Sequence, residues 1–152
     1  MAASHDGADS SDVIVANMAA DILQKLPKPF SREKAGNDTF SAAAGALGVV
    51  LGQEIDRYNR LLKTMDHTLN DLRRALQGLV VMSFELEGMY TAMLNNQVPE
   101  IWNHVSYLSI KPLASWVLDF HRKMTFMRTW LEKGAPKSFW LPGFFFPQVC
   151  LG

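Results

Sequence analysis

The sequence predicts an all-α protein, an irregular antiparallel helical bundle with one long amphipathic helix and an aromatic, irregular C-terminal tail. Apolar residues recur every three or four positions over one very long stretch and over shorter stretches before and after it. Prolines, glycines and capping residues separate these stretches. With 152 residues, one domain with a reasonable core is the default expectation.

The longest stretch predicts a helix from Leu47 to Leu79, up to about 50 Å long. Its apolar positions are Leu47, Leu51, Ile55, Tyr58, Leu62, Met65, Leu69, Leu72, Leu76 and Leu79. The positions between them are polar or charged, namely Gln53, Asp56, Arg57, Arg60, Lys63, Asp66, Asp71, Arg73 and Arg74. Because an isolated helix is marginal in water, we expect this apolar seam to be covered by partners.

The N-terminal region predicts a shorter helix followed by a connection. Residues 1–11 are small, polar and acidic, and we expect them to be disordered. Ser11 or Asp12 can cap a helix whose apolar positions are Val13, Ile14, Val15, Met18, Ala19, Ile22, Leu23 and Leu26. Pro27 ends it, and the following polar residues predict a linker with a subdomain boundary near residues 30–40.

Gly78 is the expected end or kink of the long helix, and the apolar run 79–82 after it is expected to be buried. Ser83 then caps a second helix with apolar positions Leu86, Met89, Tyr90, Met93 and Leu94. Residues 95–97 end this helix, and Pro99 opens a short helical turn that carries Ile101, Trp102 and Val105.

Pro112 is well placed to begin a third helix. Its apolar positions are Leu113, Trp116, Val117, Phe120, Met124, Met127 and Leu131, and we expect Asp119, Arg122, Lys123, Arg128 and Glu132 on the opposite, solvated face. The segment 139–147 holds five aromatic residues and two prolines, so it predicts an irregular tail that must lie against other surfaces. Its apolar surface predicts self-association or a bound partner.

Composition argues against several classes of function. Fifteen basic residues balance fifteen acidic ones, so no basic surface points to nucleic acid. No apolar run is long enough to span a bilayer, and the N-terminus is unlike a signal or transit peptide. Cys150 is the only cysteine, which excludes an internal disulfide and fits the reducing cytoplasm.

The sequence offers no constellation for catalysis, for a cofactor or for a metal. His5, His67, His104 and His121 lack the spacing of metal ligands, and His121 is expected on a helix surface. Residues 134–138 lack the second glycine and the spacing of a phosphate-binding loop. We therefore assign no catalytic, cofactor-binding or metal residue, and predict that the chain is not an enzyme.

Two groups of residues have both a structural and a functional interpretation. Helical spacing of Met89, Met93, Met124 and Met127 could form a pliable groove, but core packing is the favoured interpretation. Trp102, Trp116, Trp130 and Trp140 could belong to a core or to an interface, and the sequence does not separate these possibilities.

Several longer motifs resemble the end of dynein heavy chains, especially the axonemal ones. They are residues 20–30 (ADILQKLPKPF), 52–62 (GQEIDRYNRLL), 78–83 (GLVVMS), 98–102 (VPEIW), 106–107 with 111–113, and 139–146 (FWLPGFFF). The resemblance covers roughly residues 18–148. Leu108 and Ala114 depart from it, because the family usually has proline and glycine there.

The resemblance implies an organisation and a function. Residues 12–40 would be the helix and linker at the end of the AAA+ small subdomain of the sixth module, and residues 41–152 the N-terminal half of the C-terminal domain. The chain would then be a truncated fragment, a structural subdomain of an ATP-driven, minus-end-directed microtubule motor for axonemal or ciliary movement. Its partners would be the rest of the motor ring and the other dynein subunits, and the family's ATP-binding residues would lie elsewhere.

A second hypothesis is a stand-alone helical interaction module. In this case the seam from Leu47 to Leu79 would pair with a second copy or another helix as a coiled coil. Tyr58 and Met65 within the seam favour heterogeneous packing over a regular zipper.

Overall fold

The computed structural model describes residues 3–31 and 45–133. Within these ranges it contains five α-helices and no strand: α1 (Ala3–Lys25), α3 (Gly45–Leu76), α4 (Phe84–Leu94), α5 (Glu100–Asn103) and α6 (Leu113–Lys133). The predicted all-α class is therefore confirmed. The predicted C-terminal tail lies outside the described residues.

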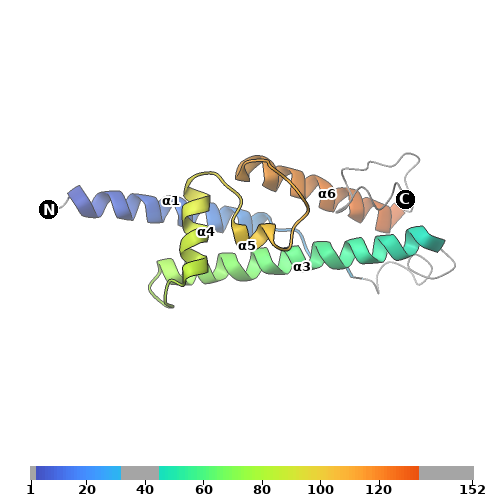
Figure 1. The fold of residues 1–152 in the computed structure, drawn as a ribbon, viewed down its shortest axis with the longest axis horizontal. Coiled ribbons are helices and arrows are strands. Elements are labelled where there is room, and N and C mark those ends of the chain that lie inside the picture. Colours follow the sequence, from blue (N-terminus) through green and yellow to red (C-terminus); the bar gives the residue numbers. More distant parts are fainter. Residues whose placement is uncertain (1–2, 32–44, 134–152) are drawn as a thin grey trace.

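Three long helices run along the long axis of the molecule (Figure 1). The direction of α3 is opposite to that of α1 and α6, and α4 crosses this direction steeply at one end. The short helix α5 lies near the middle of the molecule, over α3. This arrangement is the irregular antiparallel bundle that the sequence predicts.

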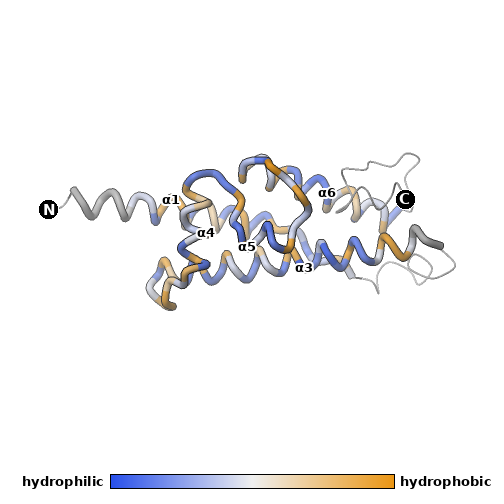
Figure 2. Tube along the Cα trace, in the orientation of Figure 1, coloured by the Kyte–Doolittle hydropathy of each residue, from blue (hydrophilic) through white to orange (hydrophobic). Residues whose placement is uncertain are grey.

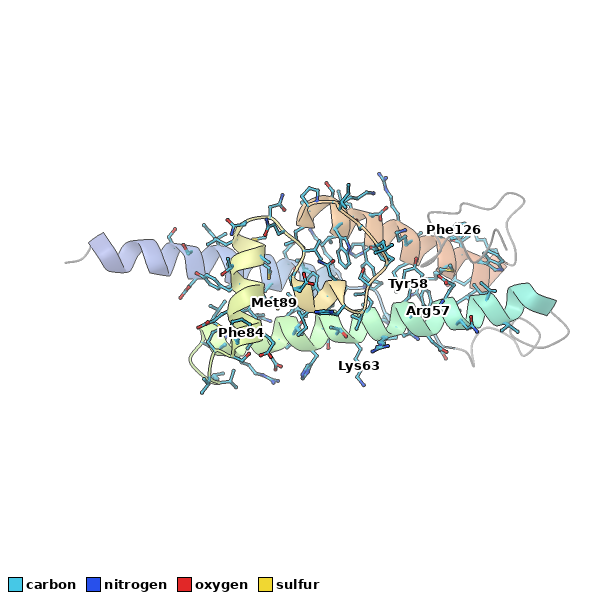
Figure 3. All side chains as sticks on the ribbon, viewed as in Figure 1. Arg57, Tyr58, Lys63, Phe84, Met89 and Phe126 are labelled. Carbon is cyan, nitrogen blue, oxygen red and sulfur yellow. The ribbon has the colours of Figure 1, made fainter. Side chains whose placement is uncertain are left out.

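The apolar seam of α3 lies in the core, as predicted. Its buried members are Leu51, Ile55, Tyr58, Leu62, Met65, Leu69 and Leu72, and Leu61 joins them although it lies beside the predicted seam. Lys63 projects away from the bundle on the outer side of α3 (Figure 3). Thus one face of α3 is dry and the other is solvated, as its periodicity requires.

Helix α1 packs along α3 and buries Val15, Ala19 and Ile22. The predicted disorder of residues 1–11 is wrong for Ala3 to Ser11, because α1 already begins at Ala3. No proline interrupts this stretch, so only the low helix propensity of its residues opposes extension of the helix. The other end agrees with the sequence, since α1 stops at Lys25, two residues before Pro27.

The end of α3 is a Schellman turn centred on Gly78. The Gly78 N–H donates to the Ala75 carbonyl at 3.0 Å, and the Leu79 N–H donates to the Arg74 carbonyl at 2.9 Å. Gly78 has a φ of 76°, which is accessible to glycine at little cost. Gly78 therefore ends the helix where the sequence predicts, and it turns the backbone toward α4.

The remaining helices begin and end at the predicted signals. The Ser83 hydroxyl accepts the Leu86 N–H at 3.2 Å and caps α4. Asn96, with a φ of 55°, follows the end of α4 and also reaches the start of α6. Its carbonyl accepts the Leu113 N–H at 3.0 Å, and its side-chain oxygen accepts the Ala114 N–H at 3.1 Å. One residue thus joins the end of one helix to the beginning of another.

We predict that Leu69→Asp lowers the free energy of unfolding by at least about 3 kcal/mol, because it places a carboxylate in the buried seam. Arg60→Ala on the exposed face of the same helix should change it by less than about 0.5 kcal/mol. Urea denaturation followed by circular dichroism measures both. Equal losses for the two variants would show that the faces of α3 are assigned wrongly.

Candidate functional site

Within residues 3–31 and 45–133, no three His, Cys, Asp or Glu side chains lie together in a way that could hold a metal ion. The exposed His67 and His104 each lie near a single carboxylate. The Nε2 atom of His67 is 3.2 Å from Asp71, and that of His104 is 3.8 Å from Glu100. None of the described helices is long and apolar enough to cross a membrane. The distinctive features of this part of the protein are therefore its aromatic core, its buried charges and its exposed apolar residues.

The centre of the core is a group of aromatic rings around Trp116 of α6. Its ring centroid lies 5.7 Å from that of Trp102, 5.6 Å from that of Tyr107 and 5.7 Å from that of Phe120. All four side chains are buried. Such contacts add about 0.5–1.5 kcal/mol each beyond the area they bury, so this group holds α5, the following loop and α6 together.

Trp102 also ties α5 to α3 by a buried hydrogen bond. Its indole Nε1–H donates to the Thr68 hydroxyl at 2.9 Å, and that hydroxyl donates to the Thr64 carbonyl at 2.7 Å. Trp102 and Trp116, together with the buried Trp130, are core residues, while Trp140 lies outside the described residues. The core interpretation of Met89, Met93, Met124 and Met127 is confirmed by their burial.

Among the residues with described side chains, two charged ones lie inside the bundle, and the sequence predicted neither. Glu54 of α3 is fully buried and accepts a hydrogen bond from Arg57 at 3.1 Å. Lys123 of α6 is 6% exposed, with its ammonium 4.5 Å from the centroid of the Tyr107 ring and 3.8 Å from Asp119. The predicted solvated position of Lys123 is therefore wrong, because its long stem packs over the aromatic group while its charge finds a ring face and a carboxylate.

Burial shifts the ionisation of the groups around this cluster. It lowers the pKa of Lys123, an effect that Asp119 opposes, and it raises the pKa values of Tyr58 and Tyr107. Asp119 also lies 3.1 Å from Lys111, at the end of the loop before α6. Perturbed groups often mark active sites, but these side chains are packed between α3, the loop and α6. Their arrangement fixes the loop and α6 on the core.

A groove of about 320 Å³ runs between α1 and α6. Its lining is mostly apolar and consists of Met18, Asp21, Ile22, Lys25, Asn96, Leu113, Ala114, Val117, Leu118 and His121. The His121 Nε2 atom is buried there and has no hydrogen-bond partner. Burial lowers the pKa of His121, and the nearby positive charge of Lys25 lowers it further. The neutral imidazole is therefore the form that the fold favours.

The turn between α3 and α4 forms an exposed apolar corner, which we define as Leu79, Val80, Val81 and Phe84 (Figure 2). Leu79 is 69% exposed, Val81 89% and Phe84 87%. The predicted burial of residues 79–82 is wrong for Leu79, Val80 and Val81, because the Schellman turn directs the backbone away from the seam. Helix α4 begins only a few residues later, before the backbone can return to the seam of α3. This corner therefore has no cover among the described residues.

The fold and its surfaces define a helical structural module built on one long amphipathic helix. Its buried polar groups stabilise the packing, and its apolar corner is exposed. Comparison with known proteins gives this class a family. Residues 1–152 match the C-terminal domain of the dynein heavy chain, and the protein belongs to this family.

The similar proteins are axonemal dynein heavy chains. The sequence is 44% identical over 145 residues to dynein axonemal heavy chain 1 of Rattus norvegicus and 43% identical over 143 residues to dynein axonemal heavy chain 6 of Homo sapiens. It is 42% identical over 142 residues to dynein axonemal heavy chain 12 of Homo sapiens. These alignments cover 95%, 91% and 93% of this protein, but only 3%, 3% and 5% of the respective relatives.

This membership confirms the resemblance and corrects one prediction. The prediction that the chain is not an enzyme is wrong as it was made, because the relatives are dynein heavy chains, which are ATPase motors. It rested on the lack of a phosphate loop in 152 residues, of which the 145 that align correspond to only 3% of dynein axonemal heavy chain 1.

We predict that Thr68→Val lowers the free energy of unfolding by about 1–3 kcal/mol, because it leaves the buried indole N–H of Trp102 without an acceptor. Thr64→Val is the matched control, since the exposed Thr64 hydroxyl bonds only the Arg60 carbonyl of its own helix, at 3.0 Å. Chemical denaturation of both variants tests this expectation. A Thr68→Val protein as stable as the control would contradict the role of this bond.

His121 predicts a pH dependence of stability. The folded-state pKa of His121 is lowered, because burial favours the neutral imidazole. The contribution of this neutral side chain to the free energy of unfolding is therefore fully present above the ordinary pKa of about 6.5, and it is lost as the pH falls through the folded-state pKa. Between pH 7.5 and 5.5, the wild-type protein should therefore lose more stability than His121→Gln. Melting temperatures of the two proteins across this range measure the difference, and parallel curves would contradict the prediction.

Proposed function

We propose that these residues form a structural part of an axonemal dynein heavy chain, an ATP-driven motor that moves toward microtubule minus ends, and that their own contribution is mechanical. The observation that carries this proposal is the match to axonemal heavy chains over up to 95% of the sequence. The rest of the proposed motor would lie in the other parts of such a heavy chain. The corresponding location is the axoneme of cilia, within the cytoskeleton.

The structure supports a packing role over a stand-alone coiled coil. The seam residues from Leu51 to Leu72 are buried within the protein's own bundle, so this face is not open to a second helix. Large apolar side chains are exposed instead at the apolar corner. We propose that this corner packs against the rest of the heavy chain, and that the motor ring and other dynein subunits are the partners.

The division of the protein into two segments also remains a proposal. In it, residues 12–40 end the AAA+ small subdomain and residues 41–152 begin the C-terminal domain. The part of α1 that lies in the first segment packs directly on α3 of the second. If the two segments belong to different modules, their contact is one route by which movement of a module could reach the C-terminal domain.

An antibody raised against residues 103–112, a mostly exposed stretch apart from the apolar corner, tests the proposed location. In ciliated cells it should label axonemes, and the antigen should be extracted by high salt together with dynein heavy chains. Cells in which the transcript is depleted provide the control for specificity. Labelling that is absent from cilia, or extraction without any dynein heavy chain, would contradict the proposal.

Substitution of the apolar corner tests the proposed packing surface. Val81→Ser combined with Phe84→Ser should change the melting temperature of the protein by no more than about 2 °C, because both side chains are exposed. The same variant should weaken binding to the separately produced remainder of a dynein heavy chain by at least about tenfold, as burial of two large apolar side chains is lost. Arg60→Ser is the exposed control. Unchanged binding by the double variant would contradict a role for this corner.

A further inference from the structure

Residues 26–31, the described part of the linker after α1, are fastened to α3 by a pair of hydrogen bonds. The backbone N–H of Phe30 donates to the Asn59 Oδ1 atom at 2.8 Å, and the Asn59 Nδ2 atom donates back to the Phe30 carbonyl at 2.9 Å. The amide side chain thus pairs with one residue of the linker as a neighbouring strand would. The Phe30 ring is buried and meets Tyr58 edge to face, with centroids 6.4 Å apart.

Helix α6 holds the same linker from its other side. The Arg128 Nη2 atom donates to the Lys28 carbonyl at 2.6 Å, and its guanidinium lies 4.9 Å from the centroid of the Phe30 ring. Pro27 and Pro29 restrict the backbone on either side of Lys28, so little freedom remains between these contacts. Residues 27–30 are therefore restrained and are held by two helices at once.

A separate contact holds α1 near its middle. The Tyr90 hydroxyl of α4 donates to the Asp12 carboxylate at 2.6 Å. The packed section of α1, with Val15, Ala19 and Ile22, lies between this contact and the linker. Helix α1 is thus held by α4 near its middle, by its packing along α3, and by α3 and α6 through the residues that follow it.

We propose that Lys28 and Phe30, together with Asn59 and Arg128, form a clamp that makes α1 move as one rigid body with α3 and α6. A displacement of α1 would then be passed to the bundle rather than absorbed in residues 26–31. This inference deepens the proposed mechanical function and rests on it for its biological meaning. The clamp itself is a property of this protein and can be tested without a motor.

Pulsed electron spin resonance distances between paired labels test the clamp in the 152-residue protein. One pair joins Asn17 of α1 to Lys63 of α3, and a reference pair joins Lys63 to Arg122 of α6, all three being exposed positions. Cys150 is first replaced by serine. In Asn59→Leu, which removes both hydrogen bonds to Phe30, the distribution for the first pair should broaden about twofold while the reference pair stays unchanged.

Asn70→Leu is the matched control, since the Asn70 side chain bonds only Asp66 within α3, and it should change neither pair. Arg128→Met tests the α6 side and should broaden the first pair alone. The clamp is overturned if the first pair keeps its width in both variants, or if both pairs broaden equally, which would indicate a general loss of packing. Should Asn59→Leu fail to fold, the result for Arg128→Met decides. The antibody labelling of cilia tests the proposed function separately.

Discussion

The long apolar face of α3 has to be covered, and the other described elements are arranged around this requirement. A helix of 32 residues gains most of its stability from packing this face rather than from its own hydrogen bonds. Each neighbour covers a different section: α1 packs along its side, Phe30 meets Tyr58, and α5 approaches through Trp102 and Thr68. Because no single helix covers the seam, several described elements share this role, among them the segment around Phe30 and the short helix α5.

Local signals made much of this fold predictable from sequence. The ends of α1, α3 and α4 follow from proline, glycine and serine, whose effects act within a few residues. The buried faces of α3 and α6 follow from spacing. These features need no knowledge of which elements meet in space.

The features that sequence could not predict depend on distant neighbours. Lys123 is buried because the Tyr107 ring and the Asp119 carboxylate receive its ammonium. Helical spacing places Asp119 beside Lys123, but it does not place Tyr107 there. Asn59 looks like any polar residue of a helix until Phe30 is placed beside it. The predicted burial of residues 79–81 failed because these residues are apolar but no described element packs against them. The sequence therefore did not predict the structural roles of these polar residues, whereas its longer motifs indicated the family.

Asn96 has a consequence for the order in which the bundle assembles. It stands at the end of α4, yet its carbonyl and its side chain accept the first two N–H groups of α6, from Leu113 and Ala114. The start of α6 is thus completed by a residue that comes 17 positions earlier than Leu113 in the sequence. Since most helices are capped by residues next to them, α6 should fray at its first turn until α4 and the loop after α5 are in place. Folding of α6 is then conditional on that of α4, a dependence that favours a single cooperative transition over independent formation of α4 and α6.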